Sequence, residues 1–162
     1  MGSGKSTIGR KLAKFLEYTF IDTDYEIEDD QGCSIEEIFK YGGEECFRDM
    51  ETHLLQKIKN VTKSVIATGG GIILREKNQE ILKMIGKQVY LKVPREILLQ
   101  RLQNDRNRPL LRDNNPEIIL KKMFDERCFL YEQADFIIET GKISPKETAL
   151  QIIQVLSHED KK

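Results

Sequence analysis

Short apolar runs alternate along the chain with longer segments in which apolar residues recur every three or four positions. In the first of these segments Ile8, Leu12 and Leu16 fall on one face of a helix. The apolar run at residues 64–68 has the length and composition of a buried strand. The pattern predicts strands at residues 20–22, 64–68, 89–93 and 136–138, and helices at residues 5–17, 34–41, 44–59, 77–84, 116–131 and 145–156, with another helix beginning after Pro94. Such alternation is typical of an α/β protein, in which a parallel sheet lies between two layers of helices.

Size and composition indicate one domain that covers residues 1–162. The 39% of hydrophobic residues is enough for a core, and the apolar runs are far shorter than the ~20 residues of a membrane span. A net charge of −1 argues against nucleic-acid binding. The three cysteines form no C-x-x-C pair, and no secretory signal is evident. We therefore expect a cytoplasmic protein, monomeric and without nucleic-acid or membrane partners.

The chain begins with a glycine-rich segment that matches the last part of the phosphate-loop pattern G-x-x-x-x-G-K-[ST]. Glycines let backbone N–H groups curve around an anion at the positive end of the following helix. The lysine can reach the β- and γ-phosphates of a nucleotide, and the next hydroxyl can bind Mg²⁺. The matching residues are Gly2, Ser3, Gly4, Lys5, Ser6 and Thr7. The alternative is a Gly-Ser-rich tail before an ordinary helix.

No strand precedes this loop, and the first glycine of the pattern would lie two positions before Met1. A phosphate loop ordinarily joins a central buried strand to its helix, so we expect that strand to be missing from the sequence. Its loss would leave two neighbouring strand edges unpaired. We expect a late start codon or a trimmed sequence, and a natural protein longer by roughly ten residues, about one strand and the start of the loop.

Two carboxylates, Asp22 and Asp24, follow the strand predicted at residues 20–22. Strand alternation would place both on one side at the carboxyl end, where open α/β sheets bind their ligands. The alternative is a solvated turn, in which aspartate is common. Further along, Ser34 and Glu37 have the spacing of a capping box for the helix predicted at residues 34–41.

Four more motifs follow in order along the chain. They are Phe47-Arg48-x-x-Glu51, the glycines at 69–71, Arg108-Pro109-Leu110-Leu111 and Arg127-x-x-x-Tyr131. Taken singly, the charged pair at 48 and 51 is typical of a helix surface, and the glycines are typical of a flexible turn. With the phosphate loop and the two aspartates, the ordered set resembles the shikimate kinase family over essentially the whole chain.

The resemblance implies roles on the acceptor side of a kinase site, with substrate-binding helices at about residues 24–60. Asp22 would assist Mg²⁺ through a bound water, and Asp24 would hydrogen-bond the acceptor hydroxyl and take its proton. Two arginines would bind the substrate carboxylate, with Glu51 orienting the first, because a planar guanidinium matches a carboxylate better than lysine does. The glycines would let the backbone approach the substrate ring closely. The arginines are Arg48 and Arg127, and the glycines are Gly69, Gly70 and Gly71.

The same resemblance implies a lid at about residues 104–115. Arg108 would close with this lid over the transferring phosphoryl group, and Arg101 would stack on adenine. The implied reaction is transfer of the ATP γ-phosphoryl group to the 3-hydroxyl of shikimate, with one Mg²⁺ per subunit. Two alternatives stay open: a related gluconate or nucleoside monophosphate kinase, and a non-catalytic nucleotide-binding module.

Overall fold

All strands in the described parts of the chain, residues 2–103 and 116–159 of this computed structural model, run in parallel pairs. Strand β1 (Thr19–Asp22) pairs with β2 (Ser64–Ala67), with Thr19 opposite Ser64. Strand β3 (Val89–Lys92) pairs with β4 (Phe136–Glu139), with Val89 opposite Phe136. All the strands predicted from the sequence are confirmed, with bounds that differ by a residue or so.

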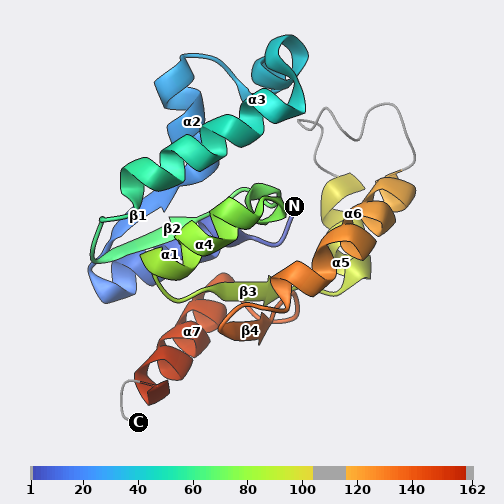
Figure 1. Ribbon diagram of the computed structural model, residues 1–162. Coiled ribbons are helices and arrows are strands. Elements are labelled where there is room, and N and C mark those ends of the chain that lie inside the picture. The colour runs from blue at the N-terminus through green and yellow to red at the C-terminus, as the bar shows by residue number, and fades with distance from the viewer. Residues whose placement is uncertain (1, 104–115, 160–162) are drawn as a thin grey trace.

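Helices cover both faces of these strands, which confirms the predicted three-layer α/β arrangement (Figure 1). On one face α1 packs against α7, and Ile8 and Leu12 share a core with Leu91 and Ile138. On the other face α3 and α4 bury a second core around Leu55. The helical segments are α1 (Lys5–Leu16), α2 (Thr23–Gln31), α3 (Ile35–Ile58), the 3-10 turn η1 (Ile72–Leu74), α4 (Glu76–Ile85), α5 (Arg95–Gln103), α6 (Pro116–Tyr131) and α7 (Pro145–Glu159).

The strands form two separate pairs rather than one continuous sheet. Strand β2 bonds to β1 and β3 bonds to β4, and no ladder joins β2 to β3 in the described residues. A cavity of about 420 Å³ separates the two pairs.

Two local features depart from the sequence pattern or refine it. The apolar pattern did not predict helix α2, because its nine residues carry five carboxylates and show little apolar periodicity, although the range of about 24–60 that the resemblance implies for substrate-binding helices includes it. The two helices predicted at 34–41 and 44–59 together make up the segment labelled α3, and they meet at Gly43, whose backbone is not helical, with a φ of 76°. The capping box is confirmed, since the Ser34 amide donates to Glu37 at 2.9 Å and the Glu37 amide donates to Ser34 Oγ at 3.3 Å. This bonding to Ser34 lowers the pKa of Glu37. None of the described helices is long and apolar enough to cross a bilayer.

Candidate active site

The glycine-rich loop at the start of the chain leads directly into α1. Gly4 precedes the helix with a φ of 86°, a conformation that favours glycine, and no side chain caps the first backbone amides. Lys5 Nζ donates to Ser3 Oγ at 3.3 Å, and the side chains of Ser6 and Thr7 lie exposed on the first turn. Uncapped amides, a lysine and two hydroxyls at a helix N-terminus form a site suited to phosphate groups.

Arg101 lies against this same loop. Its Nη1 donates to the Gly2 carbonyl oxygen at 3.0 Å, which brings the end of α5 to the start of the chain. The family resemblance implies that Arg101 stacks on adenine, and this contact shows its guanidinium beside the glycine-rich loop.

Arg48 and Glu51 form an ion pair that is buried rather than exposed on a helix surface. Arg48 Nη1 lies 2.7 Å from Glu51 Oε2, and Nη2 lies 2.8 Å from Glu44 Oε1. The exposed fractions of Arg48 and Glu51 are 7% and 0%. Glu51 Oε1 is buried and has no hydrogen-bond partner among the described residues. Helix α3 thus holds the Arg48 guanidinium between the carboxylates of Glu44 and Glu51. Glu51 Oε1 remains a buried acceptor without a donor among the described residues.

The electrostatics of this pair follow from its burial. Burial raises the pKa of Glu51 above its usual value, although the bond from Arg48 opposes the shift. Burial disfavours the Arg48 cation, but the bonds to Glu51 and Glu44 outweigh it and raise the pKa of the guanidinium. Arg48 therefore stays a cation, while the negative charge on Glu51 is costly in this environment.

The glycine loop after β2 fits closely against these charged groups. A Cβ on Gly69 would lie 2.6 Å from Asp24 Oδ1 and 2.9 Å from Glu51 Oε1. A Cβ on Gly71 would overlap the Arg48 guanidinium. The structure thus gives a direct reason for glycine at both positions, and it brings Asp24, Arg48 and Glu51 to one loop.

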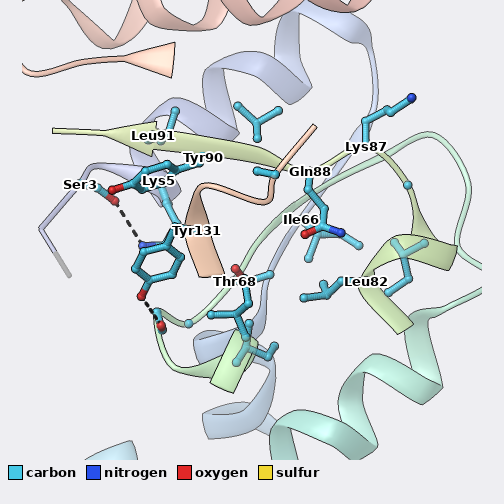
Figure 2. Close-up of a pocket in the computed structure, with 18 of the residues that line it drawn as sticks. Ser3, Lys5, Ile66, Thr68, Leu82, Lys87, Gln88, Tyr90, Leu91 and Tyr131 are labelled. Atoms are coloured by element: carbon cyan, nitrogen blue, oxygen red, sulfur yellow. Dashed lines mark hydrogen bonds between the residues drawn. The ribbon is translucent and has the colours of Figure 1, made fainter. Parts of the chain in front are cut away.

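Two side chains fix the backbone of the glycine loop. The buried Thr23 Oγ1 accepts a hydrogen bond from the Gly69 amide at 2.9 Å. The Tyr131 hydroxyl donates to the Gly70 carbonyl oxygen at 2.5 Å, as Figure 2 shows. Burial raises the pKa of Tyr131, so this phenol stays a donor at neutral pH.

Arg127 and Lys5 come from opposite ends of the chain to one cavity, which also includes Gly69 and Gly70. Arg127 Nε is buried and has no hydrogen-bond partner within residues 2–103 and 116–159. A buried, unpaired guanidinium N–H costs free energy, and an anionic ligand could satisfy it. The glycine-rich loop and Arg127 therefore border the same cavity.

Asp22 and Asp24 lie close together, but the prediction that they alternate along one strand was wrong. Thr23 and Asp24 already belong to α2, so the two carboxylates do not alternate along a strand. Asp22 ends β1 and caps α2, with its Oδ1 accepting a hydrogen bond from the Asp24 amide at 3.2 Å. The capping aspartate stops the strand and turns Asp24 toward the glycine loop.

The oxygen ligands proposed for Mg²⁺ are chemically suitable. Ser6 offers an exposed hydroxyl on the first turn of α1, and Asp22 keeps a second carboxylate oxygen beyond its cap. Mg²⁺ prefers oxygen ligands and usually keeps several waters with one or two protein groups. Within residues 2–103 and 116–159, no three His, Cys, Asp or Glu side chains are grouped so that they could hold a metal ion. Arg108 and the lid at 104–115 lie outside the described residues.

Sequence reasoning missed several residues that shape the site. Thr23 lies between the two aspartates in the sequence. Its hydroxyl can accept the Gly69 amide only because β2 pairs with β1 in the fold. Glu44 lies one turn before Arg48, so its i,i+4 spacing was a usable signal. Buried Asn78 donates to the Ile72 carbonyl oxygen at 2.9 Å and holds the end of the glycine loop. No pattern in the sequence marks that contact.

A parallel α/β fold with a glycine-lysine loop at the N-terminus of a helix, and a buried arginine site beside it, defines a P-loop phosphotransferase. A family model of shikimate kinases matches residues 1–157. The chain belongs to the shikimate kinase family and is therefore an ATP-dependent kinase.

Individual relatives agree with this assignment. The shikimate kinase of Thermodesulfovibrio yellowstonii is 42% identical over 154 residues, covering 95% of this chain and 89% of the relative. That of Cupriavidus pinatubonensis is 44% identical over 157 residues, covering 96% of this chain and 82% of the relative. Among solved structures, shikimate kinase from Acinetobacter baumannii in complex with shikimate superimposes with a TM-score of 0.95 at 42% identity, covering 100% and 91% of the two chains. Shikimate kinase from Aquifex aeolicus gives a TM-score of 0.85 at 34% identity, covering 99% and 94%.

Proposed function

We propose that this chain transfers the γ-phosphoryl group of ATP to the 3-hydroxyl of shikimate, using the residues of the cavity described above. The observation that carries the acceptor assignment is the buried Arg48, held by Glu51 and Glu44 beside the glycine loop. A guanidinium fixed by two carboxylates is preorganised to bind a ligand carboxylate. Gluconate also carries a carboxylate, but the family found for the chain favours shikimate over both gluconate and a nucleobase.

On the nucleotide side, Lys5 and the amides at the start of α1 bind the phosphates. Arg101, which bonds to the Gly2 carbonyl oxygen of this loop, would contact the nucleotide. Ser6 and Asp22 would hold one Mg²⁺, which neutralises charge on the phosphate oxygens when bound. Each of these groups acts by binding and orientation, which is most of what phosphoryl transfer requires of a protein.

On the acceptor side, Arg48 and Arg127 bind the substrate carboxylate. Glu51 orients Arg48, and the absence of side chains at residues 69–71 lets the substrate ring lie against the backbone. Asp24, which lies beside Gly69, accepts the hydrogen bond of the acceptor hydroxyl and takes its proton. Arg108 would stabilise charge on the transferring group. The enzyme would act as a cytoplasmic monomer.

Release of ADP by the purified chain with Mg·ATP tests this function, measured with shikimate, with gluconate, with AMP and without acceptor. Strong release that depends on shikimate, with shikimate 3-phosphate identified by mass spectrometry, is the expected result. A cooperatively folded chain that releases no ADP with shikimate, or that prefers gluconate or AMP, would contradict the proposal.

A further inference from the structure

The Arg48 guanidinium is enclosed by other groups of its own chain, and its side chain is only 9% exposed. The centroid of the Phe47 ring lies 5.5 Å from Arg48 Cζ, and the Gly71 backbone lies so close that a Cβ there would overlap the guanidinium. Glu51 bonds to Nη1 at 2.7 Å, and Glu44 bonds to Nη2 at 2.8 Å. Both terminal nitrogens of Arg48 are therefore already bonded to carboxylates of the chain.

The four groups around the guanidinium differ in their exposure to solvent. Phe47, Gly71 and Glu51 are buried, and the Glu51 side chain has no exposed surface. The Glu44 side chain, in contrast, is 57% exposed. Because Glu44 is the exposed member of these four, the side of the guanidinium that it covers is the one nearest to solvent.

Glu44 is placed by the interruption of α3. Gly43, immediately before it, has a φ of 76° and a ψ of 179°, which are not helical values. The helical backbone resumes after Gly43, and Glu44 lies one turn before Arg48 with i,i+4 spacing. A carboxylate in the first turn of a helical segment also interacts favourably with the positive end of that segment. Glu44 therefore has a favourable environment even when it is not bonded to Arg48.

The two carboxylates on Arg48 differ in how costly they are to release. Glu51 is completely buried, so loss of its bond to Arg48 would leave an uncompensated charge in the interior. Release of an exposed carboxylate costs little, because water replaces the lost hydrogen bond. Glu51 is thus a fixed partner of the guanidinium, whereas Glu44 is an exchangeable one.

The charges around Arg48 favour exchange of one carboxylate for another over addition of a third. Arg127 lowers the pKa of Glu51 and Asp24 raises it, so both of these charged groups act at this place. Together with Arg48 and Glu44, they make two guanidinium groups and three carboxylates. An anionic acceptor would be repelled by this excess of carboxylates, and movement of Glu44 into solvent reduces the repulsion.

We propose that Glu44 is a displaceable occupant of the carboxylate site: it bonds to Nη2 of Arg48 when no acceptor is bound, and it gives up this nitrogen to the carboxylate of the acceptor. The inference rests on the proposed function, since it takes the acceptor to be an anion bound by Arg48. Glu44 is then a positioning residue that holds the guanidinium in place between turnovers. It also adds to the selectivity for acids, because an acceptor without a carboxylate has no group that can replace it.

The test measures the dissociation constant for shikimate by isothermal titration calorimetry, on the parent chain and three variants. Glu44→Gln removes the charge, whereas Glu44→Asp keeps it on a side chain one methylene shorter, too short to bond to a guanidinium held by Glu51. Glu45→Gln is the matched control, because Glu45 is the next residue and pairs with Arg75 rather than with Arg48. Binding of Mg·ADP to the same four proteins reports on the nucleotide side.

Both Glu44 variants are expected to bind shikimate about 3- to 10-fold more tightly than the parent chain, because the acceptor no longer has to displace a bonded carboxylate. Shikimate binding by Glu45→Gln, and Mg·ADP binding by all variants, should stay within about twofold of the parent values. A merely structural role of Glu44 would give the opposite sign, since loss of a structural contact weakens binding.

Unchanged or weaker shikimate binding by Glu44→Gln would overturn the proposal. Tighter binding by Glu44→Gln but not by Glu44→Asp would also overturn it, because the effect would then come from charge at a distance and not from the bond to Arg48. Equal tightening by Glu45→Gln would overturn it for the same reason. A parent chain that binds no shikimate would overturn the proposed function, and this inference with it.

Discussion

The guanidinium of Arg48 and the carboxylate of Glu51 are joined at 2.7 Å within one helix, and the Glu51 side chain is completely buried. Removal of one member of a buried ion pair leaves an uncompensated charge, which costs about 3–5 kcal/mol. The stability of the fold is therefore sensitive to substitution of either residue, and the pair lies beside the glycine loop.

Substitution Arg48→Lys is expected to weaken acceptor binding more than turnover. Lysine keeps the charge near Glu51 but loses the planar fork, so the KM for shikimate should rise about 10- to 100-fold, the equivalent of about 1.5–3 kcal/mol. Steady-state kinetics with shikimate varied at saturating ATP measure this. Arg75→Lys is the matched control, since Arg75 forms ion pairs with exposed Glu45 and Asp49. Equal increases in KM for both variants would contradict the assigned role.

Substitution Lys5→Ala should act on the chemical step. Loss of a positive group aimed at the transferring phosphates is expected to lower kcat by about 100- to 1,000-fold. The thermal midpoint should change little, because Lys5 is only partly buried. The control is Lys11→Ala, which removes an exposed lysine from the same helix. A kcat for Lys5→Ala within a factor of three of the parent chain would refute the phosphate-binding role.

Substitution Gly69→Ala should disturb the acceptor geometry. The added Cβ would lie 2.6 Å from Asp24 Oδ1, so either the carboxylate or the loop must move. A misplacement of about 1 Å can cost about 100-fold in rate, and we expect a loss of that size in kcat/KM for shikimate. Gly86→Ala is the control, because no heavy atom lies within 4 Å of a Cβ at that position. An unchanged kcat/KM in the Gly69 variant would show that the reaction does not depend on the present position of Asp24.

Burial of Glu51 predicts a specific pH dependence of stability. Its pKa is raised above the usual 4.5, so its stabilising contribution is full below pH 4.5 and is lost as the pH rises through the folded-state pKa. Between pH 4.5 and 7.5 the free energy of unfolding of the parent chain should fall relative to that of Glu51→Gln. The fall should be about 1.4 kcal/mol for each unit by which the pKa of Glu51 is raised. Urea unfolding of both chains at the two pH values measures the difference. A rise in the free energy of unfolding of the parent chain relative to Glu51→Gln over this pH range would contradict the prediction, because pairing with Arg48 would then outweigh burial. Glu44→Gln controls for the exposed partner of the same guanidinium.

Substitution Tyr131→Phe should loosen the glycine loop without removing an aromatic ring. The lost hydrogen bond to the Gly70 carbonyl oxygen is worth about 1 kcal/mol, and we expect a comparable loss of stability with a higher KM for shikimate. Tyr90→Phe is the matched control, because Tyr90 stacks on Tyr131 with ring centroids 5.2 Å apart. Identical KM values for the two variants would mean that Tyr131 contributes only through the packing of its ring and not through its hydroxyl.

The sequence pattern predicted most of the fold because strand and helix periodicities are local. The pairing of Arg48 with Glu51 was also predictable, since residues three apart share a helix face. Burial of that pair was not predictable in this way, because it depends on contacts with the glycine loop, which is distant in the sequence. The same holds for Thr23, whose hydroxyl reaches a backbone amide 46 positions away.

Helix α2 shows a different limit of sequence reasoning. It lacks an apolar periodicity because Ile27 and Thr23 are its only buried residues. Asp22 caps its first turn, and Asp24 and Glu26 put negative charge near the positive end of the helix. Both features stabilise it. A short polar helix of this kind is stabilised by its cap and its neighbours, neither of which a hydrophobic pattern records.

The central claim is that Arg48 and Arg127 recognise a carboxylate on the acceptor. Its most direct test compares shikimate with its methyl ester as acceptors for the same enzyme, by ADP release with Mg·ATP. The ester keeps the ring and the 3-hydroxyl but has no charge for the two guanidinium groups. We predict that kcat/KM is at least about 100-fold lower for the ester, as expected for loss of charge-assisted bonds to the two arginines. Equal kcat/KM for the two acceptors would contradict the account.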